Sequence, residues 1–215
     1  MLTIFLSTLS HDIIALLTIV NPIAAASIMV TMVSPLTPTN IHSTALKATL
    51  TVVIASLVTL FSGELIFKLF GINVLSLKVI GGIILMFIAI HMAYGHGSKT
   101  RHSQEEQDEA QDKEDVSIVP LAIPILFGPG MIATIIVLNN DHLKHFSSLM
   151  SYTIISIAIF VIAFIVYFTL RYAGNINKAL GITGMKILTR IMGLIVGAIA
   201  AQFLVSGIKG LWATL

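Results

Sequence analysis

The sequence predicts an all-α membrane protein with six transmembrane helices, arranged as an inverted 3+3 repeat in which helices 1 and 4 are discontinuous. Three observations support this prediction. Hydrophobic residues make up 56% of the chain and charged residues only 10%, whereas soluble domains carry about 25% charged residues. Six apolar runs are long enough to cross a bilayer, which takes about 20 residues. The order of features in the first three runs returns in the last three.

The six apolar runs follow one another along the chain. They cover roughly residues 10–33, 45–69, 75–94, 116–139, 146–170 and 187–211. The first connection, residues 34–40, is rich in turn-forming residues, and Gly71-Ile72-Asn73 makes a tight second connection. Because the first 20 residues contain no Lys or Arg, we expect this segment to be mature structure and not a secretory signal.

Residues 96–117 form a polar segment between the third and fourth runs. The segment lacks aromatic residues and has little to bury, so we predict a disordered linker. It divides the chain into a first repeat, residues 1–95, and a second repeat, residues 118–215. An acidic regulatory segment is the alternative interpretation, since the acidic residues are Glu105, Glu106, Asp108, Glu109, Asp112, Glu114 and Asp115.

The internal repeat is visible in the order of the runs. In each half a run with a proline break comes first, a smooth run second and a glycine-bearing run third. Because three spans per half is an odd number, the second half must enter the membrane from the opposite side, which gives an inverted repeat. The aligned pairs are Pro22 with Pro129, Ala26 with Ala133 and Ser27 with Thr134.

The distribution of Lys and Arg predicts the orientation. With six spans both termini share a side, and that side carries four of the basic residues: Lys68, Lys78, Lys144 and Lys209. Cytoplasmic connections carry the excess of positive charge, so the side with eight should be cytoplasmic and both termini periplasmic. The eight are Lys47, Lys99, Arg101, Lys113, Arg171, Lys178, Lys186 and Arg190.

Two breaks stand out inside the apolar runs: Asn21-Pro22-Ile23 and Gly128-Pro129-Gly130. Proline removes a backbone donor and glycine adds conformational freedom. Freed backbone groups in hydrocarbon cost several kcal/mol each unless they find partners or line a wet cavity. Interrupted helices at matching positions in two halves indicate a transporter site near the bilayer midplane. The alternative is that the prolines merely kink packed helices.

The residues around the breaks predict the kind of solute. Each half-helix after a proline begins with free N–H groups that suit a carboxylate, and freed carbonyls before it suit an ammonium group. Nearby residues are neutral, such as Thr31, or small, such as Ala25 and Ala26, so a zwitterion with a small side chain fits. Replacing Pro129 by Ala should restore the helix and lower transport. The predicted substrate-binding residues are Asn21, Pro22, Ile23, Ala24, Ser27, Gly128, Pro129, Gly130 and Thr134.

Glu64 is the predicted proton-coupling residue, because a carboxylate within an apolar run can carry a proton. Its alternative role is an interfacial residue that reaches the lipid headgroups. His11 and Asp12 lie at the outer end of the first run, and we expect no histidine deep in a span. This argues against an intramembrane protease, which needs a Ser–His pair or two aspartates at depth.

Other functional classes find little support in the sequence. The chain has no cysteine, and its histidines lack metal-ligand spacing on one helix face, so we expect no metal site and no cofactor. No dense basic cluster points to nucleic acid. Glycine pairs, Gly81-Gly82 and Gly193 with Gly197, predict close helix packing.

The motifs in hand resemble the MarC family, which is also described as small neutral amino acid transporters. They are the Asn21-Pro22-Ile23 break, the proline-rich run from Pro120 to Gly130, and the run from Thr189 through Arg190 to Gln202. The resemblance covers the chain outside the linker. It implies six spans, an inverted repeat, a bacterial inner membrane and proton-driven uptake of glycine, alanine and similar amino acids. It assigns the broken-helix residues to Asn21, Pro22, Gly128, Pro129 and Gly130.

One departure from the family pattern concerns pocket size. The family often has glycine soon after Asn-Pro-Ile, whereas this chain has Ala24-Ala25-Ala26. The added methyl groups would narrow the pocket. The expected partners are a neutral amino acid, the lipid bilayer and protons. The alternatives are an exporter of another small metabolite and a non-transporting accessory or stress-response membrane protein.

Overall fold

The computed structural model describes residues 2–32, 37–71, 73–94 and 116–213. The predicted linker therefore lies outside the described residues up to Asp115, and Ser117, its last predicted residue, already begins a helical segment. The described part of the chain is helical, which confirms the predicted all-α class. Its elements are α1 (Leu2–Val20), α2 (Pro22–Met32), α3 (Pro38–Leu69), α4 (Val74–Tyr94), η1 (Ser117–Leu126), α6 (Pro129–His142), α7 (Ser148–Arg171) and α8 (Ala173–Trp212).

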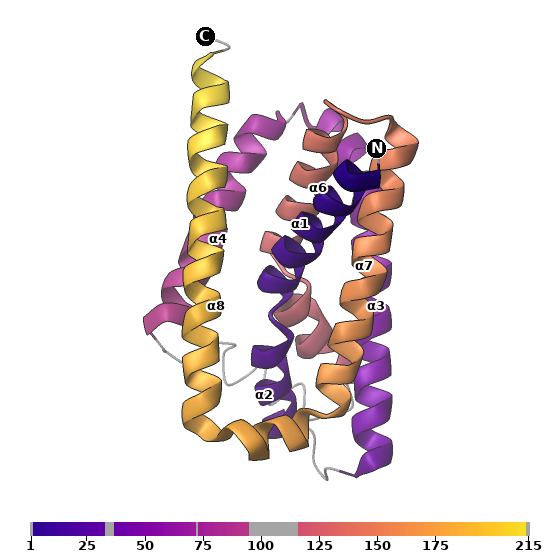
Figure 1. Cartoon of the computed structure of the whole chain (residues 1–215), viewed down its shortest axis with the longest axis vertical. Helices are drawn as coiled ribbons and strands as arrows, with labels where there is room; N and C mark the ends of the chain where they lie inside the picture. Colours follow the sequence, from indigo (N-terminus) through magenta and orange to yellow (C-terminus); the bar gives the residue numbers. More distant parts are fainter. Residues whose placement is uncertain (1, 33–36, 72, 95–115, 214–215) are drawn as a thin grey trace.

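The elements form an elongated bundle in which α1 begins and α8 ends at the same end (Figure 1). We name this the terminal end, and we name the opposite end, where α3 begins, the far end. Both ends of the described chain thus lie on one side, as an even number of crossings requires. Which side faces the cytoplasm stays a prediction.

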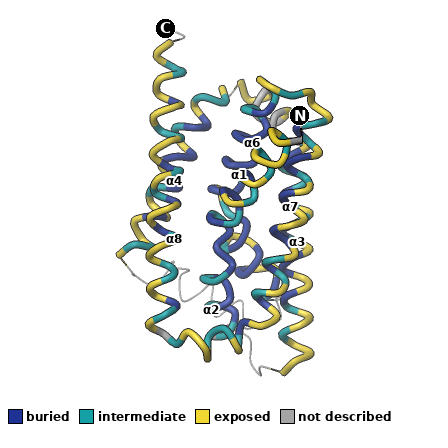
Figure 2. The backbone as a smooth tube through the Cα atoms, in the orientation of Figure 1, coloured by how far each residue is buried: buried dark blue, intermediate teal, exposed yellow. Residues whose placement is uncertain are grey.

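Among the described residues, five segments are long and apolar enough to cross a membrane: Thr3–Val30, Pro38–Gly63, Val74–Tyr94, Ser148–Arg171 and Thr183–Trp212. The pair η1 and α6 passes the same test together and is bent by 53°, so it is a sixth span if the pair crosses as one. Exposed positions recur along α3, α7 and α8 (Figure 2). They include large apolar side chains, for example Phe61, Phe164 and Leu194. Such a surface suits lipid and not water.

Glycines allow α4 and α8 to pack closely along their length. A methyl group built on Gly82 would lie 2.9 Å from the carbonyl oxygen of Ala200, and one built on Gly193 would lie 3.0 Å from that of Ala89. Side chains at these positions would push the two backbones apart. The sequence prediction of a small-residue packing face on these helices is therefore confirmed at Gly82 and Gly193.

A second group of helices surrounds the broken segments. The helices α3 and α7 pack on each other and flank α1, α2, η1 and α6. Of these, α6 is largely buried and the described side chains of α2 are buried or half-buried, whereas α1 and η1 also carry exposed residues such as Ile14 and Ile123. The core between them contains the fully buried side chains of Leu16, Met29, Leu121, Ile135 and Ile155. This core holds the two predicted breaks at the centre of the bundle.

The last helix contains a sharp turn that the hydropathy pattern did not indicate. Gly181 has φ 61° and ψ 179°, a conformation that favours glycine. The segment before it runs across the far end of the bundle, and the long remainder rises beside α4 (Figure 1). The predicted span began at residue 187, and the apolar helix begins at Thr183.

Candidate functional site

The first break is a single residue, Asn21, between α1 and α2. Asn21 has φ 45°, in the left-handed region that asparagine tolerates better than most residues. Its side-chain Oδ1 accepts from the backbone N–H of Ala24 at 3.3 Å, so Asn21 caps α2. Pro22 then occupies the first position of α2, where its missing N–H is of no consequence. The Asn-Pro pair is therefore both the break and the start of the second half-helix.

The second break lies between η1 and α6. Gly128 is extended, with φ −111° and ψ −177°, and Pro129 is the first residue of α6. The carbonyl oxygen of Gly128 accepts from the N–H groups of Met131 at 2.9 Å and Ile132 at 3.2 Å. A methyl group on Gly128 would lie 2.8 Å from the carbonyl oxygen of Pro124. The close approach of this backbone therefore requires glycine at position 128.

This geometry corrects the prediction for Pro129→Ala. Because Pro129 lies at the first position of α6, an alanine there would restore an N–H that has no intrahelical acceptor. The break depends instead on the extended conformation of Gly128 and its approach to Pro124. Pro129→Ala is therefore not expected to restore a continuous helix.

The segment η1 is more irregular than a single break predicts. Val119 and Ile123 have extended conformations within it, and each precedes a proline. The peptide bonds before Pro120 and Pro124 are cis. A residue before proline is restricted towards extended conformations, so the sequence did carry this signal.

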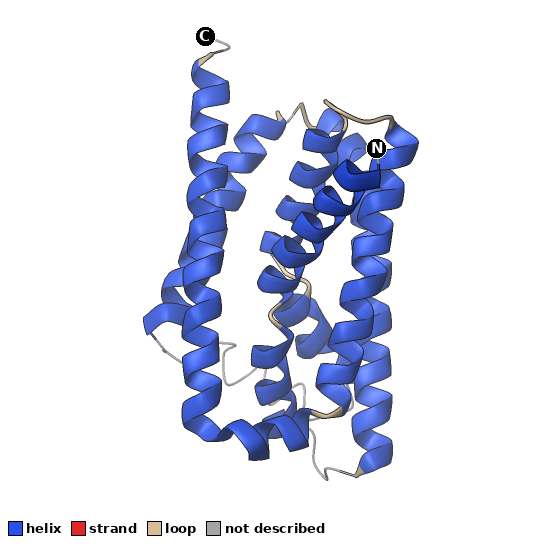
Figure 3. Cartoon of the chain, in the orientation of Figure 1, coloured by secondary structure: helices blue, strands red, loops and turns tan. Residues whose placement is uncertain are grey.

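The two breaks lie next to each other at the centre of the bundle (Figure 3). A methyl group on Gly130 would be 3.7 Å from Cγ2 of Ile19, two residues before Asn21. The half-helix α1 packs on α6, and α2 packs on η1. The predicted substrate-binding residues of the two halves are thus brought together.

The burial of these residues differs. Asn21, Pro22, Gly130 and Thr134 are buried. The hydroxyl of Thr134 donates to the carbonyl oxygen of Gly130 at 2.8 Å, within its own helix. Pro129 is exposed, while the partly buried residues are Ile23, Ala24, Ser27 and Gly128. The side chains of Thr31 and Glu64 lie outside the described part of the structure.

The helix α4 covers both breaks, a contact that the sequence did not reveal. Nδ2 of Asn21 donates to the sulfur of Met92 at 3.9 Å. On the other side, a methyl group on Gly130 would lie 2.8 Å from Cδ2 of Leu85 and 3.5 Å from Cδ1 of Ile88. The helix α4 thus contacts both breaks.

A comparison with known protein families identifies the family of this chain. A family model described as "MarC family integral membrane protein" matches residues 6–212. The chain belongs to the MarC family. Together with the long apolar helices, this makes it a multi-pass integral membrane protein.

Relatives in the family are similar over nearly their whole length. The UPF0056 membrane protein of Buchnera aphidicola (subspecies Schizaphis graminum) is 35% identical over 94% of this chain and 92% of its own. The UPF0056 membrane proteins YhcE of Escherichia coli and YvbG of Bacillus subtilis are each 34% identical. The matches cover 93% of this chain and 91% of YhcE, and 97% of this chain and 98% of YvbG. No solved structure matches the chain.

A buried polar cluster at the terminal end of this MarC-family chain was missed by sequence reasoning. The carboxyl group of Asp12 on α1 is fully buried, and its Oδ2 lies 3.2 Å from Nε2 of His142 on α6. His142 is the last residue of α6 and is buried within the protein, so the expectation that no histidine lies deep in a span stays a prediction. The apolar pattern ends at Asn139, but α6 continues to His142 because its polar side chains find partners: Asn139 accepts from Ser151 at 2.8 Å.

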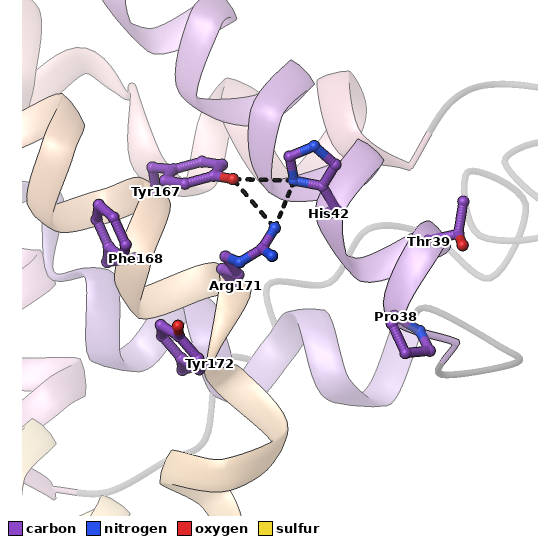
Figure 4. Close-up of a pocket in the computed structure, with 7 residues that line it drawn as sticks. All are labelled: Pro38, Thr39, His42, Tyr167, Phe168, Arg171 and Tyr172. Atoms are coloured by element: carbon purple, nitrogen blue, oxygen red, sulfur yellow. Dashed lines mark hydrogen bonds between the residues drawn. The ribbon is translucent and has the colours of Figure 1, made fainter.

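A polar recess of about 660 Å³ lies at the far end, between the start of α3 and the end of α7 (Figure 4). Nδ1 of His42 accepts from Nη1 of Arg171 at 2.7 Å and from the hydroxyl of Tyr167 at 2.9 Å. Because arginine can only donate, this arrangement leaves the ring proton of His42 on Nε2. The recess is separate from the breaks, and it holds Arg171 at the end of its span.

Proposed function

We propose that this chain is a secondary transporter that moves small neutral amino acids, such as glycine and alanine, across the bacterial inner membrane with protons as the coupling ion. The observation that carries the proposal is the contact between the two breaks, where Gly130 of the second half faces Ile19 of the first. Where interrupted helices meet inside a membrane protein, their unpaired backbone groups can bind a solute. Continuous lipid-facing helices have no such groups to offer.

The pattern of helix packing supports an inverted repeat. The half-helix α1 packs on α7, and η1 packs on α3. Likewise α2 packs on α7 and α8, while α6 packs on α3 and α4. The counterparts in the two halves are α1 and η1, α2 and α6, α3 and α7, and α4 and α8. When every element is replaced by its counterpart, each of the contacts just named becomes another of them. The pairs α3–α7 and α4–α8 map onto themselves. Two halves related by such an exchange suit alternating access.

The backbone at the breaks suits the two charged ends of a zwitterion. In the first turns of α2 and α6, Ala24 donates to Asn21 while Met131 and Ile132 donate to Gly128. The N–H groups of Ile23 and Gly130 precede these donors at the positive dipole end, which favours a carboxylate. Pro22 has no N–H to donate to the carbonyl of Thr18, four residues before it, and Pro129 cannot donate to any carbonyl of η1. An ammonium group can donate to such carbonyls.

The side chains at the breaks favour a small neutral substrate. Asn21, Ser27 and Thr134 are uncharged, and the hydroxyl of Thr134 already donates to Gly130. Ala24 is small, and a methyl group on Gly130 would already lie 2.8 Å from Cδ2 of Leu85, so a bulky substrate side chain would not fit beside it. A substrate with a charged side chain would meet no partner of opposite charge among these residues.

The structure has the breaks covered by α4, so transport requires this helix to move. Leu85 packs against Gly130, and Met92 accepts from Asn21. Because α4 packs closely along α8, we propose that the two helices move as one unit relative to the broken helices. In this proposal the terminal end faces the periplasm.

The proposal is tested with purified protein in liposomes, by uptake of radiolabelled glycine and alanine. The test variant is Thr134→Val, which keeps the shape of the side chain and removes the hydroxyl at the breaks. The matched control is Thr153→Val, because Thr153 makes the same type of bond, to the carbonyl of Leu149 at 2.7 Å, on the exposed face of α7. We expect saturable uptake that falls in Thr134→Val and is unchanged in Thr153→Val.

Two outcomes would contradict the proposal. Uptake that never exceeds that of protein-free liposomes would favour an accessory membrane protein. Uptake that is equal in wild type, Thr134→Val and Thr153→Val would show that the substrate does not bind at the breaks.

A further inference from the structure

The polar cluster at the terminal end connects a solvent-exposed histidine to a fully buried pair. The side chain of His11 is 70% exposed, that of Asp12 is 0% exposed and that of His142 is 8% exposed. Nδ1 of His11 lies 3.4 Å from Oδ1 of Asp12, and Nε2 of His142 lies 3.2 Å from Oδ2. The carboxyl group of Asp12 therefore stands between two imidazole rings, one on the surface and one inside.

The buried pair is not fully satisfied. Oδ2 of Asp12 and Nδ1 of His142 are buried without a hydrogen-bond partner, because the 3.2 Å contact is not aligned as a hydrogen bond. Buried polar atoms in stable structures are nearly always bonded, so an incomplete pair at this position calls for an explanation.

The position of the pair makes its charge important. Asp12 lies nine residues after Thr3, about 14 Å along the helix from the start of the apolar span. An ionised carboxylate beside a neutral imidazole would place a net negative charge in this region, which is costly. One added proton turns the pair into a carboxylate with an imidazolium, or a carboxylic acid with an imidazole. Both forms have no net charge.

The pair joins the two halves of the chain. Asp12 lies on α1 and His142 on α6, the two half-helices that also meet at the breaks. Asn21 is nine residues from Asp12, about 14 Å along α1, and Gly130 is twelve residues from His142, about 18 Å along α6. A change in the distance between these helices at the terminal end would change both the pair and the access to the breaks.

The other ionisable groups at this end do not contact the pair. Asp141 is held by Lys78 and Lys144, while His145 and Lys209 are exposed. On α7 the nearest titratable side chain is that of Tyr152, which packs on Phe61. In the described part of the chain His11 and His142 are therefore the ionisable partners of Asp12. The side chains of Glu64 and Lys68, near the terminal end of α3, are outside it.

We propose that His11, Asp12 and His142 form a proton-binding relay that loads one proton when α1 and α6 are closed together and releases it when they separate. A proton from bulk water binds Nε2 of His11, and the proton on Nδ1 passes to Oδ1 of Asp12. His11 returns to the neutral form. The proton is then shared between Oδ2 of Asp12 and Nε2 of His142. Separation of the helices admits water, which stabilises the ionised carboxylate and takes up the proton.

This relay rests on the proposed transport function for its role, and it supplies the coupling site of that transporter. It assigns the proton to the Asp12–His142 pair, whereas the sequence pointed to Glu64. Both assignments can be tested with one set of variants.

The experiment combines a direct measurement of protonation with a transport assay. The variants are Asp12→Asn and His142→Gln, with Glu64→Gln for the candidate that the sequence indicates and His145→Gln as the matched control. Infrared difference spectra of the purified protein between about pH 5 and pH 8 would follow proton uptake by carboxyl and imidazole groups. Liposomes loaded with a pH-sensitive dye would follow proton movement during exchange and uptake of labelled glycine.

We expect wild type and His145→Gln to show a protonation signal that is lost in Asp12→Asn and altered in His142→Gln. Asp12→Asn should still exchange labelled glycine across the membrane, but at least tenfold less glycine should accumulate against a gradient and no proton should move with it. Asp12→Glu, which keeps the carboxyl group, should recover part of the coupling.

The two proposals fail in different ways. If wild type exchanges no amino acid, the transport function is wrong, while the infrared spectra still decide whether the pair takes up a proton. Spectra that are identical in wild type and Asp12→Asn, or full proton coupling in Asp12→Asn, would overturn the relay. If proton coupling is lost in Glu64→Gln and kept in the other variants, Glu64 and not the Asp12–His142 pair is the coupling site.

Discussion

Nζ of Lys78 on α4 lies 2.8 Å from both carboxylate oxygens of Asp141 on α6. The two residues differ in exposure: the side chain of Lys78 is 7% exposed, and that of Asp141 is 40% exposed. Asp141 also accepts from Lys144 at 2.7 Å. The contact joins α4, the helix that covers the breaks, to α6. Lys78 is buried and is paired with Asp141, whereas Asp141 is partly exposed and has Lys144 as a second partner.

The unequal dependence predicts which substitution is more harmful. Asp141→Asn leaves the buried ammonium group of Lys78 without its counter-charge, which we expect to cost about 2 kcal/mol or more. Lys78→Met removes the buried charge and fills the same space, and Asp141 keeps Lys144. We expect a clearly lower melting temperature for Asp141→Asn and a small change for Lys78→Met, measured on purified protein in detergent.

The control for this prediction is Lys144→Met. Lys144 is largely exposed, and exposed ion pairs contribute about 0–1 kcal/mol. If Lys78→Met destabilises the protein as much as Asp141→Asn, the pair itself and not the stranded charge is responsible.

The close packing of α4 on α8 predicts different effects for three glycines. Gly82→Ala and Gly193→Ala would bring a methyl group to 2.9 Å and 3.0 Å from backbone oxygens of the facing helix, so the helices must move apart. Gly197→Ala is a matched control on the same helix, because its methyl group would make an ordinary 3.4 Å contact with Cβ of Ala89. We expect lower melting temperatures for the first two variants and an unchanged one for Gly197→Ala. Equal effects at all three sites would mean that helix propensity, not packing, dominates.

The conformation of Asn21 predicts an order of stability. Asn21→Ala loses the cap on α2, about 1 kcal/mol, and adopts φ 45° at a further cost of about 1 kcal/mol. Asn21→Gly tolerates the conformation and loses little as a cap. The expected order of melting temperatures is wild type, then Asn21→Gly, then Asn21→Ala.

Transport by these variants separates structure from substrate binding. Both lack the side-chain amide, so uptake should fall in both to a similar extent if the amide contacts the substrate. Uptake that follows the melting temperature would instead indicate a purely structural role for Asn21.

The sequence predicted the apolar spans well because long hydrophobic runs have few alternatives to crossing the bilayer. The third span was predicted at residues 75–94, and α4 is Val74–Tyr94. The positions of the breaks also followed from local chemistry, since an Asn-Pro and a Gly-Pro-Gly sequence disfavour a continuous helix. The small-residue face of α4 and α8 was also predicted from local sequence, since glycines on one face of a helix allow a neighbouring helix to approach closely.

The rest depends on contacts between residues that lie far apart in the sequence. Hydropathy ended the fourth span at Asn139, yet α6 reaches His142 because Ser151 and Lys78 bond its polar side chains and Asp12 lies 3.2 Å from His142. Asp12 and His142 are 130 positions apart, and no local pattern connects them. The same holds for the cover that α4 provides over the breaks. Glu64 as a coupling residue stays a prediction.

Two glycines at the second break predict a final contrast between stability and substrate size. Gly128→Ala would bring a methyl group to 2.8 Å from the carbonyl oxygen of Pro124, and that backbone cannot move without reshaping the break. Gly130→Ala would meet the flexible end of the Leu85 side chain at the same distance, and this side chain can rotate away. We therefore expect a large loss of melting temperature for Gly128→Ala and a small one for Gly130→Ala.

The effect on transport should follow a different order, because Gly130 lies where α6 faces the first break. A methyl group there takes up space that the substrate needs, so Gly130→Ala should reduce uptake of labelled alanine more than that of glycine. The ratio of the two uptake rates is independent of the amount of folded protein, which makes it insensitive to a loss of stability. An unchanged ratio in Gly130→Ala would mean that the substrate side chain does not point towards this glycine.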